Sequence, residues 1–196
     1  MDRNRRRGIS GEGLQSFIAE EFARRVGATE EQTFCTGDGN GKPTGLFGGS
    51  GGAQVGYTTT GIDITFDDVI ELFHSLKPPY RIHAAFLTND STLKQLRKLK
   101  DNNGQYLWQP AVKDGAPDTI LGKPVHASPY VPEIAADALP LAFGDFSYYW
   151  IADRCDVRFK VLSELFAQND QIGFYATERV DGKLVLPEAI KLMKMS

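Results

Sequence analysis

Residues 34–46, FCTGDGNGKPTGL, lie where a helical pattern changes into a glycine-dense segment. Upstream, from Ser10 to about Thr33, apolar residues recur every three or four positions, which predicts one long helix with a single apolar stripe that needs a partner surface. The stripe consists of Leu14, Phe17, Ile18, Phe22 and Val26. Gly27 costs about 1 kcal/mol relative to alanine in a helix, which does not end it. Downstream, residues 37–61 are expected to form a long loop, because their glycines suit left-handed turns.

Residues 64–69, ITFDDV, predict the start of a second helix. Thr65 is placed to cap the first turn, Asp68 to accept a hydrogen bond in return, and Ile64 to pack against Val69. This helix is expected to end near Lys77, because two prolines follow.

The next segment predicts a buried strand followed by a third helix. Residues 84–88, AAFLT, are short and apolar, and Asn89 or Asp90 can cap a helix carrying Leu93, Leu96 and Leu99. From residue 119 onward short extended runs dominate. They span residues 120–128, 139–143, 146–152, 157–162, 172–179 and 184–193. Asp181 and Gly182, between the last two runs, predict a hairpin turn.

Composition and charge are those of an ordinary globular protein. The chain has 196 residues, 41% hydrophobic and 24% charged, with a formal net charge of -3. This balance argues against binding nucleic acid through bulk charge. No apolar stretch has the roughly 20 residues of a membrane span, and no secretory signal is readable. Cys35 and Cys155 are far apart, so we expect free, unreactive thiols in a reducing compartment.

Two motifs suggest chemistry, but their surroundings do not support it. Ser50, in residues 48–52, fits the G-x-S-x-G pattern of a hydrolase nucleophile, yet neither the strand before it nor the helix after it is predicted. Residues 38–43, DGNGKP, resemble a phosphate loop or a calcium loop, but Pro43 follows the lysine and no terminal glutamate is present. A tight structural turn is the better interpretation.

No cofactor, metal ion or catalytic residue is predicted. The three histidines, His74, His83 and His126, lie in different elements with no second ligand at metal-binding spacing. The carboxylate pairs at residues 20–21, 30–31 and 67–68 occupy exposed or capping positions, where solvated carboxylates are normal.

Two basic clusters are interpreted as solvated charge. Arg3, Arg5, Arg6 and Arg7 form the first, and Lys94, Arg97, Lys98 and Lys100 the second. The first could touch DNA or an acidic partner, but terminal charge runs are usually solvated. The second lies on the helix face opposite its leucines.

Taken in order, several segments resemble the major capsid proteins of tailed double-stranded DNA phages, which have the Hong Kong 97-type fold. The matching segments are residues 17–23 (FIAEEFA), 34–46, 99–108 (LKDNNGQYLW), 121–125 (LGKPV), 143–146 (FGDF), 174–179 (FYATER), 181–182 and 187–192 (PEAIKL). None is decisive alone, but together they cover about residues 14–193.

The resemblance implies an α+β fold of two domains and a role in building a shell. Residues 10–61 with 150–186 would form a P domain with a long spine helix and a sheet, and residues 62–149 with 187–196 a mixed α/β A domain. Copies would form hexamers and pentamers of an icosahedral shell around double-stranded DNA, in the virion and first in the host cytoplasm. Scaffold, protease or portal proteins are possible partners, and no membrane is involved. Suspected structural turn or assembly residues are Gly37, Asp38, Gly41, Pro43, Gly45, Gly122, Gly144 and Asp145.

The chain departs from the family at its front. A full subunit would carry an N-terminal arm and a long hairpin, the E-loop, before residue 10, so residues 1–9 are interpreted as an arm remnant or unrelated lead of a truncated subunit. Cross-linking is not transferred to this chain, and neither Asn89 nor Asn169 is assigned as an acceptor. The alternatives are an encapsulin-like nanocompartment subunit, a small serine hydrolase using Ser50, and a nucleic-acid-binding module using the arginine run.

Overall fold

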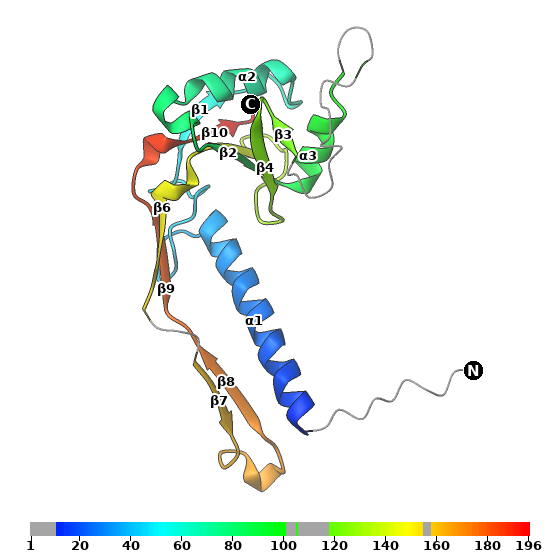
Figure 1. Cartoon of the computed structure of the whole chain (residues 1–196), viewed down its shortest axis with the longest axis vertical. Coiled ribbons are helices and arrows are strands. Elements are labelled where there is room, and N and C mark those ends of the chain that lie inside the picture. Colours follow the sequence, from blue (N-terminus) through cyan, green and yellow to red (C-terminus); the bar gives the residue numbers. More distant parts are fainter. Residues whose placement is uncertain (1–10, 101–104, 106–117, 155–157) are drawn as a thin grey trace, which may run out of the picture. The chain divides into compact units, whose positions relative to one another are not determined.

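The computed structural model describes residues 11–100, 105, 118–154 and 158–196. Its contacts divide the chain into two compact units. One contains the residues up to Glu31 and Asp153–Val180, and the other contains Gln32–Ala152 and Asp181–Ser196. Figure 1 shows that helices and a mixed sheet occur together, as the α+β prediction required. The assignment of the chain's parts to P and A domains stays a prediction.

The long helix is α1, Gly11–Thr36, which ends three residues beyond the predicted end. Gly27 lies inside it, so this glycine does not interrupt the helix. Of the predicted apolar stripe, Leu14 and Phe17 are exposed and the other members are half-buried. The predicted helix is therefore confirmed, and its stripe is only partly covered within this chain.

Helix α2, Phe66–Ser75, begins with the predicted cap. The Asp68 amide donates to Thr65 Oγ1 at 3.3 Å, and the Thr65 amide donates to Asp68 Oδ2 at 2.8 Å. Asp68 is buried, and the Tyr57 hydroxyl also donates to it at 2.9 Å. The helix ends before the 3-10 turn Pro78–Arg81, as the prolines predicted.

Helix α3, Asp90–Arg97, follows strand β2, Ala85–Thr88. Asn89 is its cap and accepts a hydrogen bond from the Ser91 amide at 2.9 Å. Leu93 and Leu96 are buried. The prediction of a helix, a strand and a second helix in this region is confirmed.

A six-stranded mixed sheet organises the larger unit. Its order is β1-β10-β5-β2-β4-β3, with β1 parallel to β10, β2 parallel to β4, and the other neighbours antiparallel. Besides β2, its strands are β1 Gln54–Thr58, β3 Thr119–Ile120, β4 Lys123–Ala127, β5 Leu141–Gly144 and β10 Ile190–Lys194. Strands from distant parts of the chain alternate, so neither half of this sequence can form the sheet alone.

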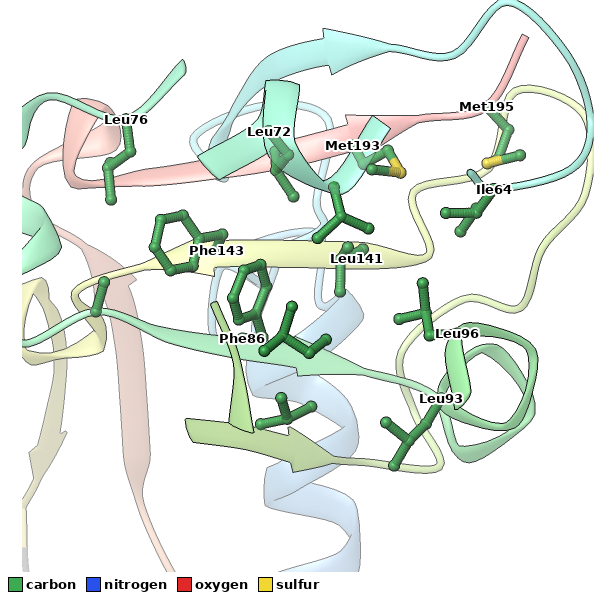
Figure 2. Close-up of a cluster of buried hydrophobic side chains, with 14 residues drawn as sticks. Ile64, Leu72, Leu76, Phe86, Leu93, Leu96, Leu141, Phe143, Met193 and Met195 are labelled. Carbon is green, nitrogen blue, oxygen red and sulfur yellow. The ribbon is translucent and has the colours of Figure 1, made fainter. Parts of the chain in front are cut away.

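The main core lies between the sheet and helices α2 and α3 (Figure 2). Phe143 on β5 stacks on Phe86 of β2, with ring centroids 4.3 Å apart, and on Phe73 of α2 at 5.0 Å. Leu72 of α2 and Met193 of β10 are fully buried beside them. Replacing a buried phenylalanine by alanine typically costs 3–5 kcal/mol, so this aromatic stack is a main source of the unit's stability.

A second cluster covers the opposite face of the sheet. It contains Cys35, Leu46, Phe47, Val131, Ala142, Leu184, Ile190 and Leu192. These residues come from the end of α1, the glycine-rich segment, the central strands, the segment after β4, and residue 184. The end of the long helix is therefore anchored to the sheet through packed apolar side chains.

The prediction that residues 37–61 form only a loop is wrong, because β1 lies within them. Residues 54–58 are extended because they pair with strand β10, although the surrounding segment is rich in glycine. Position 56 within β1 has little room for a side chain, because a Cβ there would be 2.4 Å from Ser75 Oγ. The glycine thus permits close packing of the strand against α2.

The predicted hairpin at Asp181 and Gly182 is also wrong, because both lie inside strand β9, Val180–Leu184. Strand β9 pairs with β6, Tyr149–Asp153. A Cβ on Gly182 would lie 2.7 Å from Tyr149 Oη and 2.9 Å from the Phe34 ring. This glycine provides room for two aromatic rings and does not form a turn.

The other extended runs are confirmed in part. The run at residues 120–128 is split into β3 and β4 by a turn, and residues 184–193 are split by the 3-10 turn Pro187–Ala189. The real hairpin of the smaller unit joins β7, Arg158–Leu162, to β8, Gly173–Thr177. Arg3 to Arg7, Cys155 and most of the predicted peripheral loop at residues 99–108 lie outside the described residues.

Gly144→Ala is expected to destabilise the protein by about 2 kcal/mol or more. The new Cβ would lie 2.4 Å from the Ala189 carbonyl oxygen and 2.5 Å from Ile190 Cα, and backbone atoms cannot move aside cheaply. Urea unfolding followed by circular dichroism measures the change. Gly61→Ala is the control, because its Cβ would meet nothing within 4 Å, and it should cause no loss.

Candidate functional site

The glycine-rich turn closes the carboxyl end of α1. The last four carbonyl groups of a helix have no partner within it. Here the carbonyls of Thr33, Phe34 and Cys35 accept hydrogen bonds from the amides of Gly37, Leu46 and Phe47, each at 2.8 Å. The backbone of the turn therefore provides hydrogen bonds for three of these four carbonyl groups.

Two of the suspected turn residues are glycine because the backbone passes too close for a side chain. A Cβ on Gly37 would lie 2.1 Å from the Pro43 carbonyl oxygen, and one on Gly45 would lie 2.4 Å from the Gly37 nitrogen. The Gly45 amide also donates to the Gly37 carbonyl at 2.8 Å. The structure thus brings Gly37, Pro43 and Gly45 together in one tight turn.

The outer part of this turn, residues 38–43, is organised by Asp38. Its Oδ1 accepts from the Asn40 amide at 3.0 Å and its Oδ2 lies 3.3 Å from Lys42 Nζ. The Asn40 hydrogen bond, helped by Lys42, lowers the pKa of the Asp38 carboxyl. Gly39 and Gly41 have φ of 78° and 67°, which disfavour other residues. The arrangement is a solvent-facing turn whose carboxylate binds its own loop.

Tyr149 secures the turn from the side of β6. Its hydroxyl donates to the Thr44 carbonyl at 2.9 Å, and its ring meets the Phe34 ring edge-on with centroids 5.9 Å apart. The Thr44 amide donates to the Gly182 carbonyl at 2.8 Å. Burial raises the pKa of Tyr149 to about 12. The sequence analysis missed this role of Tyr149 and Gly182, because no local pattern links residues so far apart.

The remaining suspected turn residues lie elsewhere in the same unit. Gly122, with φ of 75°, follows Leu121, with φ of 50°, in the turn between β3 and β4. Gly144 ends β5, and the buried Asp145 caps the following 3-10 turn by accepting from the Ser147 amide at 3.0 Å. All three roles are structural, and that of Gly144 includes the close approach to residues 189–190.

The alternative chemistries gain no support from the described residues. Ser50 is exposed in a turn that leads to β1, so the strand, turn and helix of a nucleophile elbow are not formed around it. Within the described ranges no three histidine, cysteine or acidic side chains could hold a metal ion, and no helix could span a membrane. Cys35 is buried, with its sulfur 3.9 Å from Ser128 Oγ.

One suspected carboxylate, Glu21, and one residue of the second basic cluster, Arg97, take part in surface contacts. Glu21 binds Arg24 and Arg25, whose hydrogen bonds lower its pKa to about 2. Arg97 pairs with Asp118. These contacts are those of a solvated surface and not of an acid/base pair.

The model of a family described as "Phage capsid family" matches residues 10–195. The chain belongs to this family. Among curated proteins, none matches the chain significantly. The capsid of an empty GTA particle is 33% identical, with a TM-score of 0.82 over 94% of this chain and 67% of that one. The capsid of a native GTA particle agrees equally well over 66% of its chain. This chain therefore spans about two thirds of their length.

More distant relatives share the fold. Structures titled Gordonia phage Cozz and Mycobacterium phage Bobi are each 16% identical to this chain, with TM-scores of 0.62 and 0.65. Both matches cover 95% of this chain, and they cover 64% of the first structure's chain and 66% of the second's. The holo-SrpI encapsulin complex of Synechococcus elongatus is 15% identical, with a TM-score of 0.61 over 90% of this chain and 65% of that one. The predictions of a Hong Kong 97-type fold and of a major capsid protein are confirmed.

Gly45→Ala is expected to abolish closure of the helix end and to destabilise the larger unit by about 2 kcal/mol or more, because its Cβ would overlap backbone atoms. Gly49→Ala is the matched control in the same segment, since its Cβ would meet nothing within 4 Å. Equal urea midpoints for the two variants would show that the close approach at Gly45 does not matter.

Tyr149→Phe is expected to cost about 1 kcal/mol at neutral pH, because it removes the hydrogen bond to the Thr44 carbonyl. In the native chain the pKa of folded Tyr149, about 12, exceeds the ordinary value near 10, so the folded state keeps the phenol proton to higher pH than the unfolded state does. That contribution is full below pH 10 and is lost between pH 10 and about 12. Between pH 10 and about 12 the free energy of unfolding should therefore fall more steeply with pH for the native chain than for the variant. Equal slopes for the two proteins would contradict the assignment.

Proposed function

We propose that this capsid protein builds a closed icosahedral shell from hexamers and pentamers of itself. The observation that carries the proposal is the 33% identity to a GTA capsid across 94% of this chain. No catalytic activity is part of the proposal. Function then resides in the surfaces through which copies meet.

The distribution of apolar side chains supports assembly. Trp150 and Ile151 on β6 are exposed, as are Leu165 and Ile172 beyond β7. Large exposed apolar groups that gather on particular elements are typical of protein contact surfaces. These exposed apolar side chains are therefore suited to contacts between copies.

We further propose that the shell encloses double-stranded DNA without sequence specificity, in a virion assembled in the host cytoplasm, with scaffold, protease or portal proteins as partners. The family match supports the virion location. The encapsulin-like compartment is the second candidate, supported only by the shared fold of an encapsulin at 15% identity.

The chain, or the chain extended at its front by an arm and an E-loop, is expected to form rings or shells as its concentration rises. Light scattering and negative-stain microscopy measure this. If both proteins stayed monomeric at millimolar concentration, the shell function would be wrong. Particles isolated from cells separate the two candidates, because nuclease-protected DNA supports a phage-type shell and enclosed protein supports a compartment.

A further inference from the structure

The β7–β8 hairpin of the smaller unit has two chemically different faces. Side chains alternate between faces along a strand. Phe159 and Phe174 share one face, where Phe159 contacts Phe22 of α1 with ring centroids 5.9 Å apart. The pairs Arg158 with Thr177 and Lys160 with Tyr175 occupy the other face. The hairpin therefore contacts α1 through Phe159 on its apolar face and carries basic and aromatic side chains on the other face.

An arginine-lined hollow lies at the base of this basic face. Its volume is about 420 Å³, and it is lined by Arg154, Arg158, Tyr175, Thr177, Glu178 and Arg179. The Arg154 amide donates to the Arg179 carbonyl at 3.0 Å, which holds two of the arginines on adjacent backbone. Guanidinium groups bind carboxylates through paired, parallel hydrogen bonds. The hollow thus suits a carboxylate.

The tip of the same hairpin, residues 163–172, is acidic and is therefore complementary in charge to the arginine-lined hollow. It carries Glu164 and Asp170 and no basic residue, and it is exposed throughout. Leu165 and Ile172 are 68% and 60% exposed beside the carboxylates. The turn has a defined form, because the Phe166 carbonyl accepts from the amides of Asn169 and Gln171 at 3.0 and 3.3 Å.

A protein partner explains the hollow better than nucleic acid does. Tyr175 at its edge is 51% exposed, and arginine and tyrosine are enriched in protein interfaces. Burial raises the pKa of Glu30, and the negative charges of Glu178 and Asp153 nearby raise it further. These carboxylates weaken any broad positive field, which a phosphate backbone would need.

The tip cannot reach the hollow of its own hairpin. Strands β7 and β8 separate the two, and five residues of strand span about 16 Å. Complementary surfaces at opposite ends of one rigid element can meet only between copies. Such head-to-base contacts are heterologous and generate rings when the rotation closes.

We propose that the hairpin tip of one copy, residues 163–172, docks into the arginine-lined hollow of a second copy. Glu164 and Asp170 pair with Arg154 and Arg179, and the exposed apolar residues of the tip cover Tyr175. The inference rests on the proposed shell function and names one contact that builds it.

Charge reversal in the full chain tests the contact. Glu164→Arg with Asp170→Arg reverses the tip, and Arg154→Glu with Arg179→Glu reverses the hollow. Each is expected to raise the concentration for half-maximal association by at least about tenfold, measured by sedimentation velocity. A chain with all four changes should return to within about threefold of the native value. Asp63→Arg with Glu71→Arg changes the net charge by the same amount as the tip reversal, on other exposed carboxylates. It is the control for the tip variant and should have no such effect.

Disulfide trapping tests the same contact where association is weak. In a Cys155→Ser background, one chain carries Glu164→Cys and a second, tagged chain carries Arg179→Cys. The mixed disulfide is expected to form at least about tenfold faster than in a control in which Glu71→Cys replaces Glu164→Cys. Equal rates would overturn the docking contact.

The outcomes separate this inference from the shell function. If rings or shells form but charge reversal changes nothing, the docking contact is wrong and the shell function stands. If no association, no particles and no selective trapping occur, both are wrong. If reversing the hollow lowers affinity for a duplex DNA fragment but leaves association unchanged, the hollow is a phosphate site and the docking contact is wrong.

Discussion

Closure of the carboxyl end of α1 is the constraint on which the larger unit depends. Three carbonyl groups at that end receive amides from residues 37–47, and the same residues place Leu46 and Phe47 against the second face of the sheet. Hydrogen bonding and apolar burial are thus supplied by one short segment. The segment must also be tight, which explains why Gly37 and Gly45 have no room for a side chain.

The sheet carries this constraint to the rest of the unit. Strand β10, near the chain's end, lies between β1 and β5, and Gly144 allows β5 to approach residues 189–190 closely. The aromatic stack of Phe73, Phe143 and Phe86 fills the space between sheet and helices. Since these contacts join distant segments, the unit is expected to fold as a whole and to present rigid surfaces to its neighbours.

A capsid subunit needs such rigidity, because its function is to hold contact surfaces in fixed positions. The smaller unit presents such surfaces, since its two-stranded hairpin contacts α1 through Phe159 on one face and leaves the other face and the tip exposed. An isolated two-stranded ribbon is only marginally stable. Contacts with neighbouring copies would therefore stabilise the same hairpin that forms them.

The sequence by itself determined the features that depend on local chemistry: helix α1, the Thr65 cap, strand β2, and the family through the order of its segments. Only the tertiary structure decided β1 and the place of Gly182, because both depend on partners far along the chain. A glycine read locally indicates a turn, whereas here it leaves room for aromatic rings. The arginine hollow was equally hidden, since its side chains come from separate segments that only the folded hairpin brings together.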